Sequence, residues 1–201
     1  MTDLFWQASE ISRFARASQK DQIPAILWLT GLSGSGKSTI AYELDRQLFS
    51  SKRHSYVLDG DNIRQGLNRD LGFGDADRVE NLRRVAEVAR LMADAGLIVI
   101  VSLISPFAAE RQIARETAKP IRFFEIFVDT PIETCIRRDP KGLYNKALRG
   151  EIQNFTGVSS PYERPTAPDY TIAGHGLEPE GLASHLLRQI GLRLREDDDP
   201  R

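Results

Sequence analysis

Short runs rich in apolar and β-branched residues alternate along this chain with longer segments whose apolar residues recur at spacings of three and four. The short runs predict strands, and the longer segments predict amphipathic helices. The expected strands are 25–29, 55–58, 97–101, 123–128 and 169–172, and the expected helices are 40–48, 80–95, 108–118, 132–138 and 182–194. Because 97–101 is apolar at every position, it suits a central parallel strand buried on both faces. The pattern predicts an α/β protein with a central, mostly parallel sheet flanked by helices.

The two ends of the chain carry weaker patterns. A narrow apolar stripe at helical spacing covers residues 4–15 and consists of Leu4, Ala8, Ile11 and Phe14. We expect residues 1–22 to be an N-terminal helical extension that packs on the core, with a dimer contact as the alternative. The last residues, 196–201, form an acidic tail that we expect to be solvated.

A glycine-rich segment follows the first expected strand and precedes the first long helical pattern. Its sequence, Gly31-Leu-Ser-Gly-Ser-Gly-Lys-Ser-Thr39, fits the spacing G-x-x-x-x-G-K-S/T. In this loop the backbone N–H groups converge on phosphate oxygens, the lysine neutralises the outer phosphates, and the hydroxyl after it binds magnesium. The alternative is a glycine-rich turn that matches by accident, but the strand and helix on either side favour a nucleoside triphosphate site.

Two carboxylates follow the second expected strand. Asp59 and Asp61 come at its carboxyl end, the edge of a parallel sheet where ligands bind. A carboxylate beside a phosphate-binding loop commonly organises magnesium or accepts a proton. The structural alternative is a turn, or a helix from Asn62 capped by Asp61.

Two basic segments are candidates for the remainder of a site. Residues 64–84 combine Phe73 and several glycines with five arginines, which are Arg64, Arg69, Arg78, Arg83 and Arg84. Because guanidinium groups grip phosphate and sulfate, this segment is expected to bind an anionic, ring-bearing acceptor, with a solvated basic loop as the alternative. Residues 137–165, also basic and marked by glycine and proline, are expected to form a mobile lid rather than a surface excursion.

The composition narrows the class of protein. A chain of 201 residues can fill one core, so we expect a single domain over 1–201. The 27 basic and 28 acidic residues nearly cancel, so the net charge indicates neither nucleic acid nor an anionic membrane as a partner.

The single cysteine, Cys135, is expected to be a buried side chain in a reducing compartment. His54, His175 and His185 lack metal-ligand spacing. With no secretion signal and no long apolar run, the location is expected to be cytoplasmic.

Eight blocks, in order, resemble those of the adenylylsulfate kinases, P-loop kinases that phosphorylate adenosine 5′-phosphosulfate at its 3′-hydroxyl. The blocks are 31–39, 58–62, 66–73, 77–81, 104–106, 127–131, 138–144 and 155–157. The resemblance implies a three-layer P-loop kinase fold with a mobile lid, ATP and Mg²⁺ as ligands, a homodimer, and ATP sulfurylase as a functional partner. The chain departs from the family's pattern at Asn145, where lysine is common, at Gly74, where serine is frequent, and in the N-terminal segment.

The resemblance also implies a role for each matching residue. The ATP phosphates would be held by Gly31, Leu32, Ser33, Gly34, Ser35, Gly36, Lys37, Ser38 and Thr39. Lys37 would contact the transferred group, Ser38 and Asp59 would organise Mg²⁺, and Asp61 would accept the proton of the 3′-hydroxyl. The acceptor would be bound by Arg64, Phe73, Arg78, Asn81, Ile104, Ser105, Lys141, Leu143 and Phe155. Ser105 also matches the serine that is described as becoming phosphorylated in some family members.

The residues leave other functions open. The first alternative is a P-loop kinase that acts on another anionic nucleotide or a small metabolite, since a shared fold does not determine the acceptor. A non-kinase regulator that binds a nucleoside triphosphate is a remote alternative, because the chain lacks an Asn-Lys-x-Asp signature for guanine. A catalytically inactive binding module is disfavoured by the presence of Lys37, Ser38 and Asp61.

Overall fold

A five-stranded, wholly parallel sheet forms the centre of the protein, in a computed structural model that describes residues 5, 7 and 9–191. The strand order is β2-β3-β1-β4-β5. The strands are β1 (Ala25–Thr30), β2 (Ser55–Asp59), β3 (Ile98–Ser102), β4 (Arg122–Asp129) and β5 (Tyr170–Ala173). The helices are α1 (Arg13–Ser18), α2 (Lys37–Ser50), α3 (Gly60–Gln65), α4 (Asp75–Asp94), α5 (Ala108–Ala118), α6 (Ile132–Arg138), α7 (Leu143–Leu148) and α8 (Pro179–Ile190).

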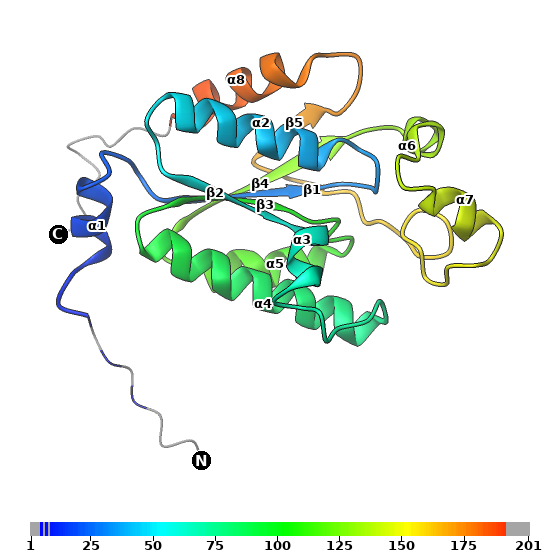
Figure 1. Cartoon of the computed structure of the whole chain (residues 1–201), viewed down its shortest axis with the longest axis horizontal. Coiled ribbons are helices and arrows are strands. Elements are labelled where there is room, and N and C mark those ends of the chain that lie inside the picture. Colours follow the sequence, from blue (N-terminus) through cyan, green and yellow to red (C-terminus); the bar gives the residue numbers. More distant parts are fainter. Residues whose placement is uncertain (1–4, 6, 8, 192–201) are drawn as a thin grey trace.

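The sheet lies between two layers of helices. Helices α2 and α8 cover one face, and α4 and α5 cover the other (Figure 1). Each face has its own core: Leu27 and Leu44 belong to the α2/α8 side, and Trp28 and Val85 belong to the α4/α5 side. Because successive residues of a strand point to opposite faces, β1 contributes Leu27 to one core and Trp28 to the other. This burial on both faces explains why β1 and β3 are apolar throughout most of their length.

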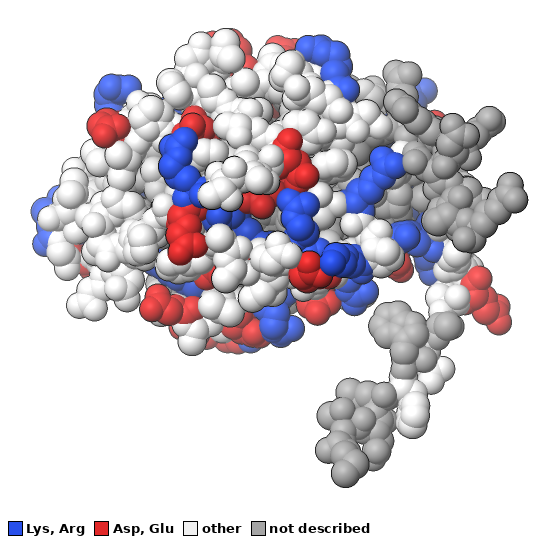
Figure 2. Space-filling model, turned by 180° about the vertical axis from the view of Figure 1, so that it is seen from behind, with Lys and Arg blue, Asp and Glu red and all other residues white. Residues whose placement is uncertain are grey.

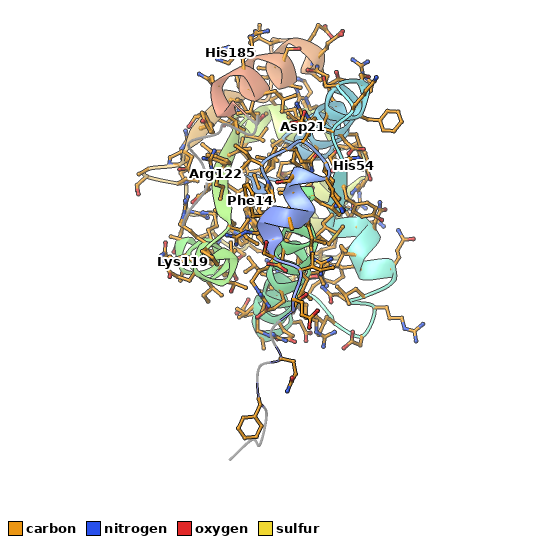
Figure 3. The ribbon with its side chains drawn as sticks, turned by 90° about the vertical axis from the view of Figure 1, so that its left-hand side faces the viewer. Phe14, Asp21, His54, Lys119, Arg122 and His185 are labelled. Carbon is orange, nitrogen blue, oxygen red and sulfur yellow. The ribbon has the colours of Figure 1, made fainter. Side chains whose placement is uncertain are left out.

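The amino ends and the carboxyl ends of the strands adjoin different segments of the chain. At the amino ends, α1 lies in front of the sheet, near the labelled Asp21, His54 and Arg122 (Figure 3). Here the fully buried Gln22 donates a hydrogen bond to the Gly96 carbonyl at 2.7 Å and accepts one from the His54 N–H at 2.8 Å. The carboxyl ends instead lead into the glycine-rich loop, α3, segment 103–107 and α6. The chemistry expected from the sequence therefore gathers at one edge.

Most of the predicted elements are confirmed, with boundaries that shift by up to four residues, as at α8 (Pro179–Ile190, predicted as 182–194), but three predictions are wrong. The helix expected over 4–15 is instead the short α1, which begins after Ser12, whose hydroxyl accepts a hydrogen bond from the Ala15 N–H at 3.1 Å. Ile11 and Phe14 are exposed rather than packed. Leu4, Ala8, Leu194 and the acidic tail lie outside the described residues, and the dimer contact stays a prediction.

The other two corrections concern the segments next to the site. Helix α4 begins at Asp75, five residues before the predicted start at residue 80. Helix α3 begins at Gly60, and its cap is Asp59, which accepts a hydrogen bond from the Asp61 N–H at 3.0 Å. Asp61 is therefore inside the first turn of α3 and is not its cap.

The face of the molecule seen from behind shows no large patch of a single charge among the described residues (Figure 2). Basic and acidic side chains alternate there among the described residues (Figure 2). Within the described part of the chain, no helix is both long and apolar enough to cross a membrane.

Candidate functional site

A cavity of about 1080 Å³ lies at the carboxyl edge of the sheet. Asp59, Asp61 and all nine residues expected to bind the acceptor line it, namely Arg64, Phe73, Arg78, Asn81, Ile104, Ser105, Lys141, Leu143 and Phe155. The glycine-rich loop contributes Ser33, Gly34, Gly36, Lys37, Ser38 and Thr39, whereas Gly31, Leu32 and Ser35 do not reach the lining. The structure thus brings together residues that are more than a hundred positions apart in the sequence.

The glycine-rich loop connects β1 to α2 with backbone angles that favour glycine. Gly34 and Gly36 have φ of 73° and 103°, in the left-handed region where a β-carbon would cause strain. Lys37 begins α2, and its ammonium donates to the carbonyl oxygens of Gly31 and Leu32 at 2.9 and 2.7 Å. Because it is buried, the pKa of Lys37 is lowered to about 8. This loop and the N-terminus of α2 form a cationic anion-binding site.

The Ser38 hydroxyl and the Asp59 carboxylate form a pair of oxygen donors beside the loop. Ser38 Oγ donates to Asp59 Oδ2 at 2.6 Å, and Ser102 Oγ lies 3.3 Å from Ser38 Oγ. Mg²⁺ prefers oxygen ligands and binds through one or two protein groups together with phosphates and water, so these residues fit it. No group of three or more His, Cys, Asp or Glu side chains suited to a metal occurs among the residues described.

Asp61 lies in the first turn of α3 and reaches the opposite wall of the cavity. Its Oδ2 forms an ion pair with the ammonium of Lys141, eighty residues later in the chain. Both side chains are mostly exposed, so the pair can exchange partners with solvent or with a ligand at small cost.

Four residues from α3, α4 and the turn between them form what we call the arginine wall: Arg64, Phe73, Arg78 and Asn81. The Arg64 guanidinium lies 4.5 Å from the Phe73 ring centroid and donates to the Gly72 carbonyl at 2.8 Å. Burial lowers the pKa of Arg64 from its ordinary value. The Arg78 Nε donates to the Phe73 carbonyl at 3.0 Å. These cationic groups face a cavity that also offers an aromatic ring.

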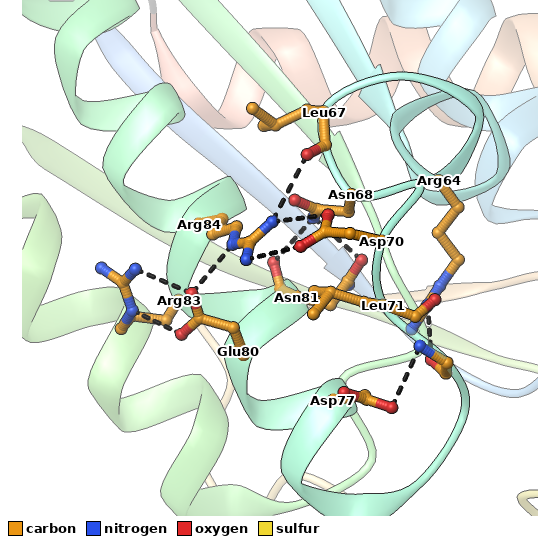
Figure 4. A network of polar contacts seen from close by, with 11 residues as sticks. Arg64, Leu67, Asn68, Asp70, Leu71, Asp77, Glu80, Asn81, Arg83 and Arg84 are labelled. Carbon is orange, nitrogen blue, oxygen red and sulfur yellow. Dashed lines mark hydrogen bonds and ion pairs between the residues drawn. The ribbon is translucent and has the colours of Figure 1, made fainter.

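The remaining arginines of this segment do not belong to the cavity. Arg83 pairs with Glu80 at 2.7 Å, and Arg84 pairs with both Glu80 and Asp70 at 2.8 Å (Figure 4). Arg69 is exposed and does not line the cavity. Of the five arginines in the segment expected to bind the acceptor, Arg64 and Arg78 therefore line the cavity, and the other three do not.

Ser105 lies at the base of the cavity in a strained conformation. Its φ is 40°, its hydroxyl accepts a hydrogen bond from the Trp28 indole N–H at 3.2 Å, and its carbonyl accepts one from Arg111 at 2.9 Å. Arg111 is itself buried against Glu125 at 2.8 Å. Arg111 was not predicted from the sequence, because a charged position in a helix normally indicates a solvated side chain. Trp28 was expected only as part of a strand, and nothing in the sequence indicated its contact with Ser105.

The segment expected to be a lid contains structure of its own. Helix α7 lies within it, and Phe155 packs edge-on against Tyr144, with ring centroids 5.0 Å apart, beside the buried Cys135. Cys135 is buried, as expected, and this burial raises the pKa of its thiol. Arg78 donates to the Thr156 hydroxyl at 3.2 Å and links this segment to the arginine wall. Its mobility stays a prediction.

A second set of lining residues, which we call the α8 wall, was not assigned to the site from the sequence, although Arg138 lies in the segment expected to be a lid. It consists of Arg138, Gly174, Leu177 and Pro179. Arg138 donates to the carbonyls of Gly34 and Gly174 at 3.2 and 2.9 Å, so it joins the glycine-rich loop to the turn before α8. Gly174 and Gly176 offered a turn signal, but nothing in the sequence places that turn beside the loop.

Comparisons with known proteins agree with the geometry. The family model described as adenylylsulphate kinase matches residues 23–173. The bifunctional enzyme NodQ of Rhizobium meliloti is 63% identical over 193 residues, which are 94% of this chain and 30% of that protein. The adenylyl-sulfate kinase of Aeromonas hydrophila is 50% identical over 98% of this chain and 100% of its own length. The solved structure of the Mycobacterium tuberculosis APS kinase CysC in complex with AMPPNP and APS has a TM-score of 0.81 and 49% identity, covering 85% of this chain and 98% of that one.

Proposed function

The chain belongs to the adenylylsulphate kinase family, and we propose that it transfers the γ-phosphoryl group of ATP to the 3′-hydroxyl of adenosine 5′-phosphosulfate. The observation that carries the proposal is a single cavity that contains both the phosphate-binding loop and the arginine wall. Two nucleotides bound there would bring a phosphate of one near a ribose of the other, as direct transfer requires.

The donor nucleotide would occupy the side of the cavity between the loop and the α8 wall. The loop amides and Lys37 would hold its phosphates, and its base would lie against Arg138, Leu177 and Pro179. Ser38 and Asp59 would hold Mg²⁺, which supplies charge neutralisation on the donor phosphates when it is bound.

The acceptor nucleotide would bind against the arginine wall. Arg64, Arg78 and Asn81 would donate hydrogen bonds to its phosphosulfate, while Phe73 and Phe155 offer rings for its base. Phe73 is 67% exposed although the Arg64 guanidinium lies over its ring, so the base would stack beside or in place of that guanidinium. Phe155 belongs to the segment expected to close. Ile104, Ser105, Lys141 and Leu143 would complete the binding surface.

Asp61 would accept the proton of the 3′-hydroxyl as the phosphoryl group moves. Its ion pair with Lys141 would have to open or shift when the acceptor enters. We assign Ser105 to acceptor binding and not to a covalent intermediate, because its hydroxyl is buried against the Trp28 indole and direct transfer needs no such step.

The acceptor must be supplied by a reaction that joins adenylate to sulfate, so an ATP sulfurylase is the expected functional partner. The bifunctional character of the NodQ relatives supports a neighbouring activity. A homodimer is proposed from the family resemblance.

The proposal is tested by measuring ADP formation with a panel of acceptors in the presence of Mg²⁺. We expect the highest kcat/KM for adenylylsulfate, with lower values for adenylate, cytidylate and a sugar phosphate. A higher kcat/KM for one of the other acceptors would point to the alternative, a P-loop kinase acting on a different anionic nucleotide or metabolite. Slow ADP formation that no acceptor accelerates would instead indicate a regulator.

A further inference from the structure

We propose that Asn68 is a positioning residue that orients the Asn81 side-chain amide, so that its NH₂ group and not its oxygen faces the acceptor. This makes the arginine wall a surface of hydrogen-bond donors only, which selects an acceptor that carries an anionic group. The inference rests on the proposed function for the identity of the acceptor. It adds a residue that does not itself line the cavity.

The orientation of Asn68 is determined by a backbone carbonyl. Asn68 is 0% exposed, and its Nδ2 lies 3.3 Å from the Asn81 carbonyl oxygen and 3.0 Å from Asn81 Oδ1 (Figure 4). A backbone carbonyl can only accept a hydrogen bond, so the Asn68 amide must present its nitrogen to it. The same NH₂ group then requires an acceptor from the Asn81 side chain, which has to be Oδ1.

The orientation of the Asn81 amide is a direct consequence. Its Oδ1 is occupied by Asn68, and within the described residues no protein group accepts from its Nδ2. Asn81 lines the cavity and is only 6% exposed, so the side chain has little freedom to turn over. The group available to a ligand is therefore the NH₂.

The cost of this arrangement argues for a role beyond stability. Asn68 Oδ1 is the one buried side-chain polar atom without a partner among the described residues. A buried oxygen left unpaired is destabilising, and an apolar side chain of similar shape would avoid it. The loop around Asn68 is already held to α4 by Arg84, which pairs with Asp70 at 2.8 Å and donates to the Leu67 carbonyl at 3.5 Å. The amide of Asn68 is thus not needed merely to attach the loop.

The chemistry of the wall becomes uniform once Asn81 is oriented. Arginine side chains have donors and no acceptors, and the Asn81 NH₂ adds a further donor beside Arg64 and Arg78. Sulfate and phosphate oxygens only accept, so they satisfy this surface, whereas a hydroxyl group presented to it leaves its own hydrogen without a partner. The class of ligand selected is an ester of phosphate or sulfate.

The test compares Asn68→Leu, Asn81→Ala and the double variant with the unchanged protein. Adenylylsulfate affinity is measured by calorimetry, and KM and kcat for both nucleotides are measured by turnover. Losing a hydrogen bond to a charged group predicts about tenfold weaker adenylylsulfate affinity for Asn68→Leu, with an unchanged KM for ATP. The double variant should be no weaker than Asn81→Ala, because both changes remove the same interaction. If Asn68→Leu does not fold, Asn68→Asp keeps the shape, but as a carboxylate it offers only acceptors, and the same loss is expected.

Arg84→Met is the matched control. It removes the ion pair with Asp70 that joins the same loop to the helix, together with the Arg84–Glu80 pair inside α4, and it leaves the two asparagines in place. It should therefore lower stability without changing adenylylsulfate affinity. Equal affinity of the unchanged protein and the Asn68 variant would overturn the inference, as would a loss in the Arg84 variant of the same size. Absence of turnover in the unchanged protein, with the affinity differences preserved, would refute the proposed function and leave the positioning role standing.

Discussion

The buried ammonium of Lys37 makes ATP binding dependent on pH above neutrality. Burial lowers the pKa of Lys37 from 10.5 to about 8. The cationic form is the one that neutralises phosphate, so the protein without nucleotide loses its binding-competent form as pH rises through about 8. The unfolded chain still holds this proton up to its ordinary pKa. The Lys37 contribution to the free energy of unfolding therefore increases with pH between about 8 and 10.5, while nucleotide binding weakens.

The size of the effect depends on the fraction of protein that carries the proton. With a pKa of about 8, Lys37 is about nine-tenths protonated at pH 7 and about one-tenth protonated at pH 9. Apparent affinity falls in proportion to the competent fraction, so ATP should bind about tenfold more weakly at the higher pH. Binding there must also draw a proton from solvent, since the phosphates favour the charged lysine.

The assay is calorimetric titration of a non-hydrolysable ATP analogue with Mg²⁺, in two buffers that differ in ionisation enthalpy. We expect uptake of about half a proton per nucleotide bound at pH 8 and close to one at pH 9. Lys37→Arg is the control, because its guanidinium stays charged across this range, so whatever affinity remains should not vary with pH. Affinity that is the same at both pH values, with no proton uptake, would refute the reasoning.

Three further predictions concern the loop and the acceptor side. Asp61→Ala should leave ATP binding intact and lower turnover by about two decades or more, as measured by steady-state kinetics, and near-normal turnover would remove Asp61 from the role of proton acceptor. Lys141→Ala should raise the KM for the anionic acceptor and change the free energy of unfolding by less than about 1 kcal/mol, because the lost ion pair is exposed; a large loss of stability in urea would contradict this. Gly174→Ala should destabilise the protein by about 1–3 kcal/mol and weaken ATP binding, because its new methyl group would overlap the Thr130 hydroxyl and the Ser35 carbonyl. Gly181→Ala on α8, where a β-carbon meets nothing within 4 Å, is the control and should be neutral or stabilising.

The sequence predicted best those parts of the fold where local and global signals agree. The run from β1 through the glycine-rich loop to α2 combines a buried strand, glycines at left-handed positions and four buried residues at helical spacing, and all of these are confirmed. Helices α5 and α6 match their predicted bounds because their periodicity is uninterrupted. In contrast, the start of α4 was placed too late, because Gly72 and Gly74 indicated a loop. Asp75 and Asp77, in the first turn of the helix, carry a helix-start signal that indicated the observed start.

The site was predictable only where its residues belong to recognisable motifs. The residues of the arginine wall were expected from the family resemblance, whereas Arg138 and Gly174 of the α8 wall were not, because only the completed sheet brings them to the loop. The roles of Asn68 and Arg111 depend on hydrogen bonds from their side chains to particular backbone carbonyls of other segments. Periodicity and composition contain no information on such contacts.

The central claim is that one cavity aligns two nucleotides for phosphoryl transfer. The most direct measurement is the mass and the NMR-determined position of any new phosphate on adenylylsulfate after incubation with the chain, ATP and Mg²⁺. We predict a single added phosphate on the 3′-oxygen, formed in equal amount to ADP. Release of ADP without any modified adenylylsulfate, or a phosphate at another position, would contradict the account.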